Sequence, residues 1–120
     1  MRTINIVYAY IAEGSAMQTQ INLAAGSETI RTLGMRASAT PYRKEIERCL
    51  DTGYSVAIDF SGKDATQSFV DELIGGLILK RGRTVLSSLS FQNCPDDVKS
   101  IIKFVVNDRA HQLKTEQAVA

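Results

Sequence analysis

The chain has few of the residues from which catalytic and metal sites are usually built. Its 120 residues include one histidine, two cysteines, two prolines and no tryptophan. Cys49 and Cys94 lie far apart and match no metal-ligand spacing, so we expect two free, reduced thiols and a cytoplasmic protein without metal or other cofactor. His111 lies beyond the strongest part of the last apolar pattern. We expect it to be a solvated side chain rather than part of a catalytic triad or dyad.

Neither charge nor apolar residues are concentrated in one place. The net charge of +1 argues against a dedicated nucleic-acid binder, because such proteins carry a basic excess. No apolar run reaches the roughly 20 residues of a membrane span, and Met1-Arg2-Thr3 does not begin a signal peptide. We therefore predict no membrane association and a single domain over residues 1–112, followed by a polar, frayed C-terminal tail over residues 113–120.

The clearest pattern in the chain is a strand followed by a long helix, between Tyr54 and Lys80. Alternating apolar residues from Tyr54 to Phe60 predict a buried strand near the centre of a sheet. After a polar turn, apolar residues recur at helical spacing and predict a helix that begins near Ser68. Ser68 is a suitable N-cap, and Asp71 follows at capping-box spacing. The core-facing stripe of this helix consists of Phe69, Val70, Leu73, Ile74, Leu77 and Ile78.

Weaker patterns predict further strands and helices on both sides of this unit. Residues 4–10 and 17–23 alternate as a hairpin, residues 28–39 form a short helix or an irregular segment, and a helix capped by Thr40 begins at Pro41 and ends at Gly53. Residues 85–91 predict an edge strand with a polar face, which leaves homodimerisation open. A last helix begins near Pro95. The order predicts an α/β fold with a mixed sheet of about four strands and three or four helices packed on it.

The outer face of the long helix is a candidate partner-binding surface. Asp71, Glu72, Gly75 and Leu79 fall opposite the apolar stripe. An interior glycine costs a helix about 1 kcal/mol relative to alanine. We therefore expect Gly75 to let a partner backbone or helix approach closely, with simple tolerance of the glycine as an equally weighted alternative. Gly76, near the inner stripe, is predicted to allow close approach to the sheet.

Several segments together resemble a STAS domain, the module of bacterial anti-sigma factor antagonists. They read IDFSG, TQSFVDELIGGL, RASATPYRKEIE and FQNCPDDVKSIIKFVVNDR, and they are more similar to the bacterial STAS-like domains of unknown function than to the antagonists themselves. The resemblance covers about residues 36–109. It implies a STAS-like fold and a non-enzymatic regulatory module in signalling, which acts by protein–protein interaction. The partner that it implies is a histidine-kinase-like ATPase.

The resemblance also implies candidate phosphorylation sites at Ser68 and Thr66. In the antagonists, the partner kinase phosphorylates a serine at this strand-to-helix junction. Their pattern Asp-Ser-Ser-Gly is replaced here by Gln67-Ser68-Phe69-Val70, and a gapless alignment places Phe69 on the phosphorylated serine. Capping of the helix by Ser68 alone is the favoured interpretation, because serine is a preferred N-cap.

Two other functions stay open. The first is a small-anion or nucleotide-sensing domain, with the ligand beside the turn formed by Asp59, Ser61, Asp64 and Ser68, because ligands of open α/β sheets bind at the carboxyl ends of strands. The second is a metal site or a small enzyme at Asp59 and Asp64. Two carboxylates without a histidine or a third acid make a weak site. We expect them to stabilise the turn instead, and we predict no catalytic residues and no enzyme.

Overall fold

A four-stranded mixed sheet forms the centre of the fold. The computed structural model describes residues 4–7, 17–23 and 32–119. The strand order is β1 (Ile4–Val7), β2 (Gln18–Asn22), β4 (Ser55–Asp59) and β6 (Leu89–Gln92). β1 pairs antiparallel with β2, whereas β2–β4 and β4–β6 pair parallel. The predicted antiparallel pair, central strand and α/β class are confirmed. Residues 8–10 of the first predicted strand lie outside the described residues.

The core lies against β4, the strand with the most regular apolar pattern. Val56, Ile58 and Phe60 are all fully buried, and Ile58 lies between Ile21 of β2 and Phe91 of β6 in the parallel register. A second, parallel pair joins β3 (Thr32–Leu33) to β5 (Asp64–Ala65). Strands of two residues carry no periodicity, so the sequence patterns did not reveal this pair.

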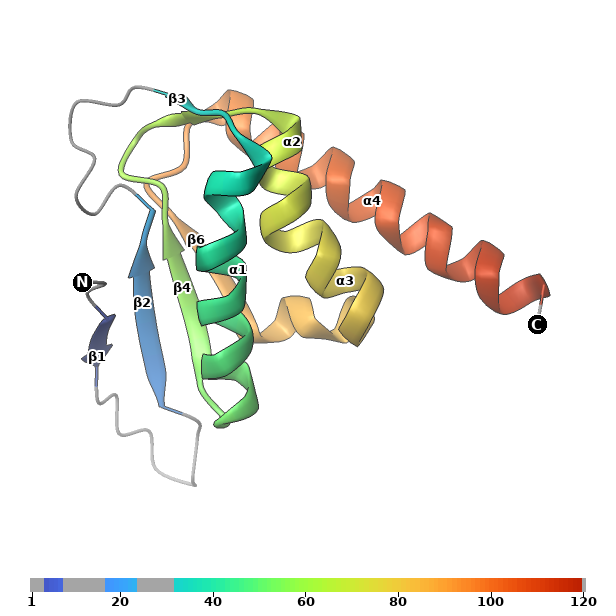
Figure 1. Ribbon diagram of the computed structural model, residues 1–120, viewed down its shortest axis with the longest axis horizontal. Coiled ribbons are helices and arrows are strands. Elements are labelled where there is room, and N and C mark those ends of the chain that lie inside the picture. Colours follow the sequence, from blue (N-terminus) through green and yellow to red (C-terminus); the bar gives the residue numbers. More distant parts are fainter. Residues whose placement is uncertain (1–3, 8–16, 24–31, 120) are drawn as a thin grey trace.

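Helices pack on one side of the sheet (Figure 1). α1 (Arg36–Asp51) and α4 (Asp96–Val119) flank a continuous helical run made of α2 (Gln67–Val70), the π-helical turn η1 (Asp71–Gly75) and α3 (Gly76–Arg81). A 3-10 helix, η2 (Arg83–Ser88), then leads into β6. α4 extends well beyond the rest of the molecule (Figure 1).

The apolar stripe predicted for the long helix is confirmed, and it forms most of the helical side of the core. Its six side chains are at most 1% exposed. Full burial of one such side chain stabilises a fold by about 2 kcal/mol, so the stripe far outweighs the roughly 1 kcal/mol that each interior glycine costs the helix. α4 completes this core through Val98, Ile102 and Val105.

Two predicted boundaries differ from the structure. α1 begins at Arg36, more than one turn before the predicted start at Pro41, so Pro41 lies inside the helix and Thr40 is not its cap. The Thr40 hydroxyl instead donates to Glu72 at 3.1 Å. Residues 85–88 belong to η2, so the predicted edge strand is shortened to β6, which does lie at the sheet edge.

The C-terminal end of the chain is helical through Val119. The domain boundary at residue 112 and the fraying of the tail stay predictions, as does homodimerisation. Among the residues that the structure describes, no helix combines the length and the apolar character needed to cross a membrane.

Candidate functional site

The helix after β4 is capped by Thr66 and not, as predicted, by Ser68. The backbone at Thr66 is extended, and its hydroxyl oxygen accepts a hydrogen bond from the Phe69 N–H at 3.2 Å. The same hydroxyl donates to the Gly34 carbonyl at 2.8 Å, which ties the helix start to the residues after β3. Ser68 is therefore the second helical residue. It is exposed, whereas Phe69 is fully buried.

Asp71 links the long helix to α4 and α1. Arg109 of α4 donates two hydrogen bonds to its carboxylate, from Nε at 2.7 Å and from Nη2 at 2.6 Å, and Arg36 of α1 donates a third at 3.1 Å. The Asp71 side chain is only 13% exposed. Burial alone would raise the pKa of this carboxyl group, but the hydrogen bonds from Arg109 and Arg36 outweigh that effect and lower the pKa below its usual range.

Glu72 makes the corresponding link to α1 alone. Its carboxylate accepts hydrogen bonds from the Arg43 Nε at 3.2 Å and from the Thr40 hydroxyl at 3.1 Å, and Arg36 lies 3.5 Å from its other oxygen. Arg36 thus contacts both acids. We call this set the acid–arginine cluster: Arg36, Arg43, Asp71, Glu72 and Arg109.

The predicted exposure of Gly75 to a partner is wrong. Gly75 is buried beneath α4, and a Cβ there would collide with the Asp71 carboxylate and approach Val105 Cγ1 to 3.3 Å. A helix does pack on this glycine, but it belongs to the same chain. A Cβ at Gly76 would meet the Arg43 side chain of α1 at an ordinary contact distance of 3.4 Å, so this glycine faces α1 rather than the sheet. Leu79 is half-buried.

An exposed surface remains beside the first turn of α2. Gln67, Ser68, Phe104 and Asp108 are exposed and line one open pocket of about 380 Å³. Asp71, Val105 and the two arginines Arg36 and Arg109 also line this pocket.

Phe104 is the residue of this surface that our sequence interpretation missed. Its side chain is 54% exposed, and it lies outside the buried stripe of α4. The signal was present in the sequence, because Phe104 falls on the polar face of an amphipathic helix.

Asp59 stabilises the turn after β4, as predicted. Its Oδ1 accepts hydrogen bonds from the Ser61 N–H at 2.7 Å and the Asn93 amide at 3.0 Å, and its Oδ2 accepts one from Gln20 at 3.1 Å. The residue is 8% exposed, so its carboxylate is committed within the chain. Of the other candidate ligand residues, Ser61 lies in this turn, Asp64 in β5 and Ser68 in α2, all exposed.

The remaining reactive side chains do not converge. Both cysteines are free thiols, as predicted, and burial raises the pKa of Cys94. His111 lies on α4 beside Arg83 and Lys114. Over residues 4–7, 17–23 and 32–119, no three acidic, histidine or cysteine side chains gather as metal ligands would.

The fold is that of a STAS-like α/β domain. It has a mixed sheet, helices on one side of that sheet, and a capped helix after the central strand. The family profile of the STAS-like domain of unknown function (DUF4325) matches residues 38–99, just over half of the chain. The chain belongs to this family. No curated protein and no solved structure matches it. The matched region includes Thr66, Asp71 and Glu72, whereas Arg36 and Arg109 lie outside it.

Proposed function

We propose that this chain is a non-enzymatic regulatory module that docks a protein partner through the start of α2. The docking surface consists of Gln67, Ser68, Phe104 and Asp108, with Arg36 at its edge. The observation that carries the proposal is the exposed Phe104 ring beside the exposed first turn of α2 in one pocket. Aromatic and arginine side chains supply much of the binding energy at protein interfaces.

The acid–arginine cluster has a supporting role in this proposal. Asp71 and Glu72, which we predicted to contact the partner directly, are 13% and 19% exposed and are held by arginines. Asp71 fixes Phe104 relative to Ser68, because Arg109 lies on the same helix as Phe104 and binds Asp71. Gly75 supports the surface from beneath by letting α4 approach, and Leu79 lies farther along the helical run.

The partner that we propose is a histidine-kinase-like ATPase, on the basis of the resemblance to anti-sigma factor antagonists. Ser68 is the proposed switch residue. Its hydroxyl is exposed and makes no hydrogen bond with the described residues, so a kinase would reach it without breaking the fold. Phosphorylation would add a charge of about −1.5 to −2 in the middle of the docking surface. Thr66 is the less suitable target, because its hydroxyl is already bonded to Gly34 and Phe69.

Calorimetric titration with a purified histidine-kinase-like ATPase from the same organism tests the proposal. We expect Phe104→Glu and Ser68→Glu each to weaken binding at least tenfold, or by about 1.4 kcal/mol. Met17→Glu is the matched control, because Met17 is also an exposed apolar residue, 41% accessible, but lies at the opposite end of the sheet. Equal losses in all three variants would contradict the docking surface.

Mass spectrometry after incubation with ATP and the same ATPase tests the switch separately. One phosphate on Ser68, absent from Ser68→Ala, is the expected result. The small-anion or nucleotide-sensing alternative at Ser61, Asp64 and Ser68 stays a prediction, and nucleotide-dependent thermal stabilisation would support it.

A further inference from the structure

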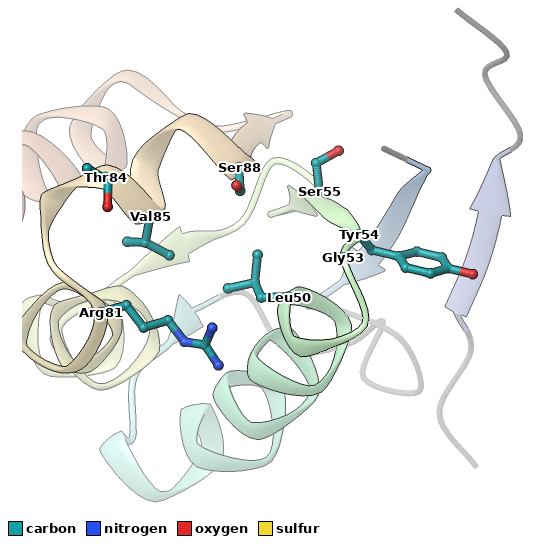
Figure 2. A pocket seen from close by; sticks show the side chains of 8 residues that line it. All are labelled: Leu50, Gly53, Tyr54, Ser55, Arg81, Thr84, Val85 and Ser88. Carbon is teal, nitrogen blue, oxygen red and sulfur yellow. The ribbon is translucent and has the colours of Figure 1, made fainter. Parts of the chain in front are cut away.

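A second pocket lies at the end of the sheet where the parallel strands begin. It has a volume of about 340 Å³ and is formed by the end of α1, the start of β4, the end of α3 and η2. The docking surface follows the carboxyl end of β4, so the two lie at opposite ends of the sheet. The lining residues are shown in Figure 2: Leu50, Gly53, Tyr54, Ser55, Arg81, Thr84, Val85 and Ser88.

Arg81 brings unused hydrogen-bond donors to this pocket. Its Nη2 donates to Asp51 Oδ1 at 2.6 Å and to the Glu47 carbonyl at 3.4 Å, which anchors the guanidinium against the end of α1. Its Nη1 has no hydrogen bond with the described residues, and its Nε is buried without a partner there. Arg81 is therefore held in place through Nη2. Its Nη1 donors stay uncommitted, whereas the Nε donor is enclosed by the protein and does not face the pocket.

Two hydroxyl groups lie across the pocket from this guanidinium. In the view of Figure 2, Thr84 and Ser88 lie on one side and Arg81 on the other, and Val85 and Leu50 belong to the apolar lining of the pocket. Neither hydroxyl is hydrogen-bonded within the described part of the chain. The hydroxyl of Ser55 and the ring of Tyr54 point away from this centre (Figure 2).

We propose that this pocket binds a phosphoryl group between the Arg81 guanidinium and the hydroxyls of Thr84 and Ser88. The Nη1 of the guanidinium supplies a charged donor to one phosphate oxygen, and hydroxyl groups donate to the remaining oxygens without adding charge. No carboxylate lines the pocket. The carboxylate paired with Arg81, Asp51, is 66% exposed and does not line the pocket, so it does not take the space that the anion would occupy.

The first test measures thermal stability and binding heat with inorganic phosphate at constant ionic strength, with chloride as the reference anion. We expect a saturable rise in melting temperature for the wild type and for Arg83→Gln. Arg83 is an exposed arginine two residues away that does not line this pocket, so Arg83→Gln is the matched control for charge. We expect Arg81→Gln to bind at least tenfold more weakly. The absence of saturation in the wild type, or equal binding by the two variants, would overturn the proposal.

Arg81→Gln also removes the bridge to α1, so two further variants separate binding from stability. Thr84→Val and Ser88→Ala leave that bridge intact, and we expect each to weaken phosphate binding severalfold without lowering the melting temperature of the unliganded protein. Unchanged affinity in both would overturn the assignment of the hydroxyls.

Comparison of ligands then decides the chemical class. We expect a phosphomonoester such as glycerol 3-phosphate to bind at least as tightly as inorganic phosphate, and a dicarboxylate such as succinate to bind more weakly. Tighter binding of succinate would overturn the phosphoryl assignment. Phe104→Glu is expected to leave phosphate binding unchanged, because this pocket does not depend on the docking surface.

Discussion

At the scale of single residues, Asp71 connects the most elements through charge. One carboxylate receives hydrogen bonds from α4 and from α1. Isolated surface ion pairs contribute about 0–1 kcal/mol. The Asp71–Arg109 pair is bidentate and mostly buried, two conditions under which ion pairs contribute more.

We predict that Asp71→Asn lowers the free energy of unfolding by about 1–2 kcal/mol at pH 7. Because the pKa of Asp71 is lower in the folded chain than in the unfolded one, its contribution is complete above the unfolded pKa of about 4 and is lost as pH falls through the folded pKa. The difference between wild type and variant should therefore be constant from pH 7 to 5 and shrink in more acidic solution. Urea unfolding at a series of pH values measures it.

Asp108→Asn is the control for the loss of one carboxylate. Asp108 lies on the same helix as Arg109, but its side chain is exposed. The assigned role of the ion pair would be contradicted if the wild type stayed more stable than Asp71→Asn by the same free energy below the folded pKa of Asp71.

The start of α2 gives a second prediction at this scale. Thr66→Ala should destabilise the fold by about 1 kcal/mol through loss of the N-cap, whereas Ser68→Ala should change stability by less than about 0.5 kcal/mol. Thr66→Ser should restore most of the loss, because serine caps equally well. Chemical denaturation measures all three, and the opposite ranking of Thr66 and Ser68 would show that the cap is misassigned.

At the scale of elements, the long helical run is held between α1 and α4, and the π-helical turn η1 lies at the centre of that packing. η1 contains Asp71, Glu72 and Gly75 together. The two acids bind the flanking helices, and the glycine lets α4 approach.

We predict opposite behaviour for the two adjacent glycines. Gly75→Ala should destabilise the fold by about 1–3 kcal/mol through overpacking, because the Asp71 carboxylate that the new methyl group meets is fixed by Arg109 and Arg36. At Gly76→Ala the new methyl group meets only the Arg43 side chain, at the ordinary contact distance of 3.4 Å, so the gain in helix propensity of about 1 kcal/mol should leave this variant neutral or more stable. Thermal and urea unfolding test the pair. Equal effects would show that α4 does not pack closely on Gly75.

Most elements could be predicted from periodicity, but the contacts between helices could not. The buried stripe from Phe69 to Ile78 and the central strand follow from local patterns. Gly75 and Asp71 were expected on a free surface because a helical pattern indicates which face is polar, but not whether another helix of the same chain covers that face. Asp71 is covered by Arg109, which lies 38 positions farther along the chain.

Helix starts were misplaced for a related reason. Ser68 and Thr40 both fit the preferences of an N-cap. In the structure, however, the N-cap of α2 is Thr66 and that of α1 is Met35. Thr66 is favoured as the N-cap by its tertiary hydrogen bond to the Gly34 carbonyl, whereas the Thr40 hydroxyl donates to Glu72. Local preference does not include these distant partners.

At the scale of the whole molecule, the two ends of the sheet carry different surfaces. The carboxyl end of β4 leads to the exposed first turn of α2 and Phe104, and the opposite end carries the pocket of Arg81. A ligand at Arg81 and a protein partner at Ser68 would therefore not compete for space.

The most direct test of the docking surface is an NMR titration of the isotope-labelled chain with the unlabelled ATPase. We predict that the amide signals that shift or broaden first belong to residues 66–69 and to the turn of α4 around Phe104, and that the same signals do not respond in Phe104→Glu. Perturbation centred instead on Met17 and residues 53–55, at the other end of the sheet, would contradict the account.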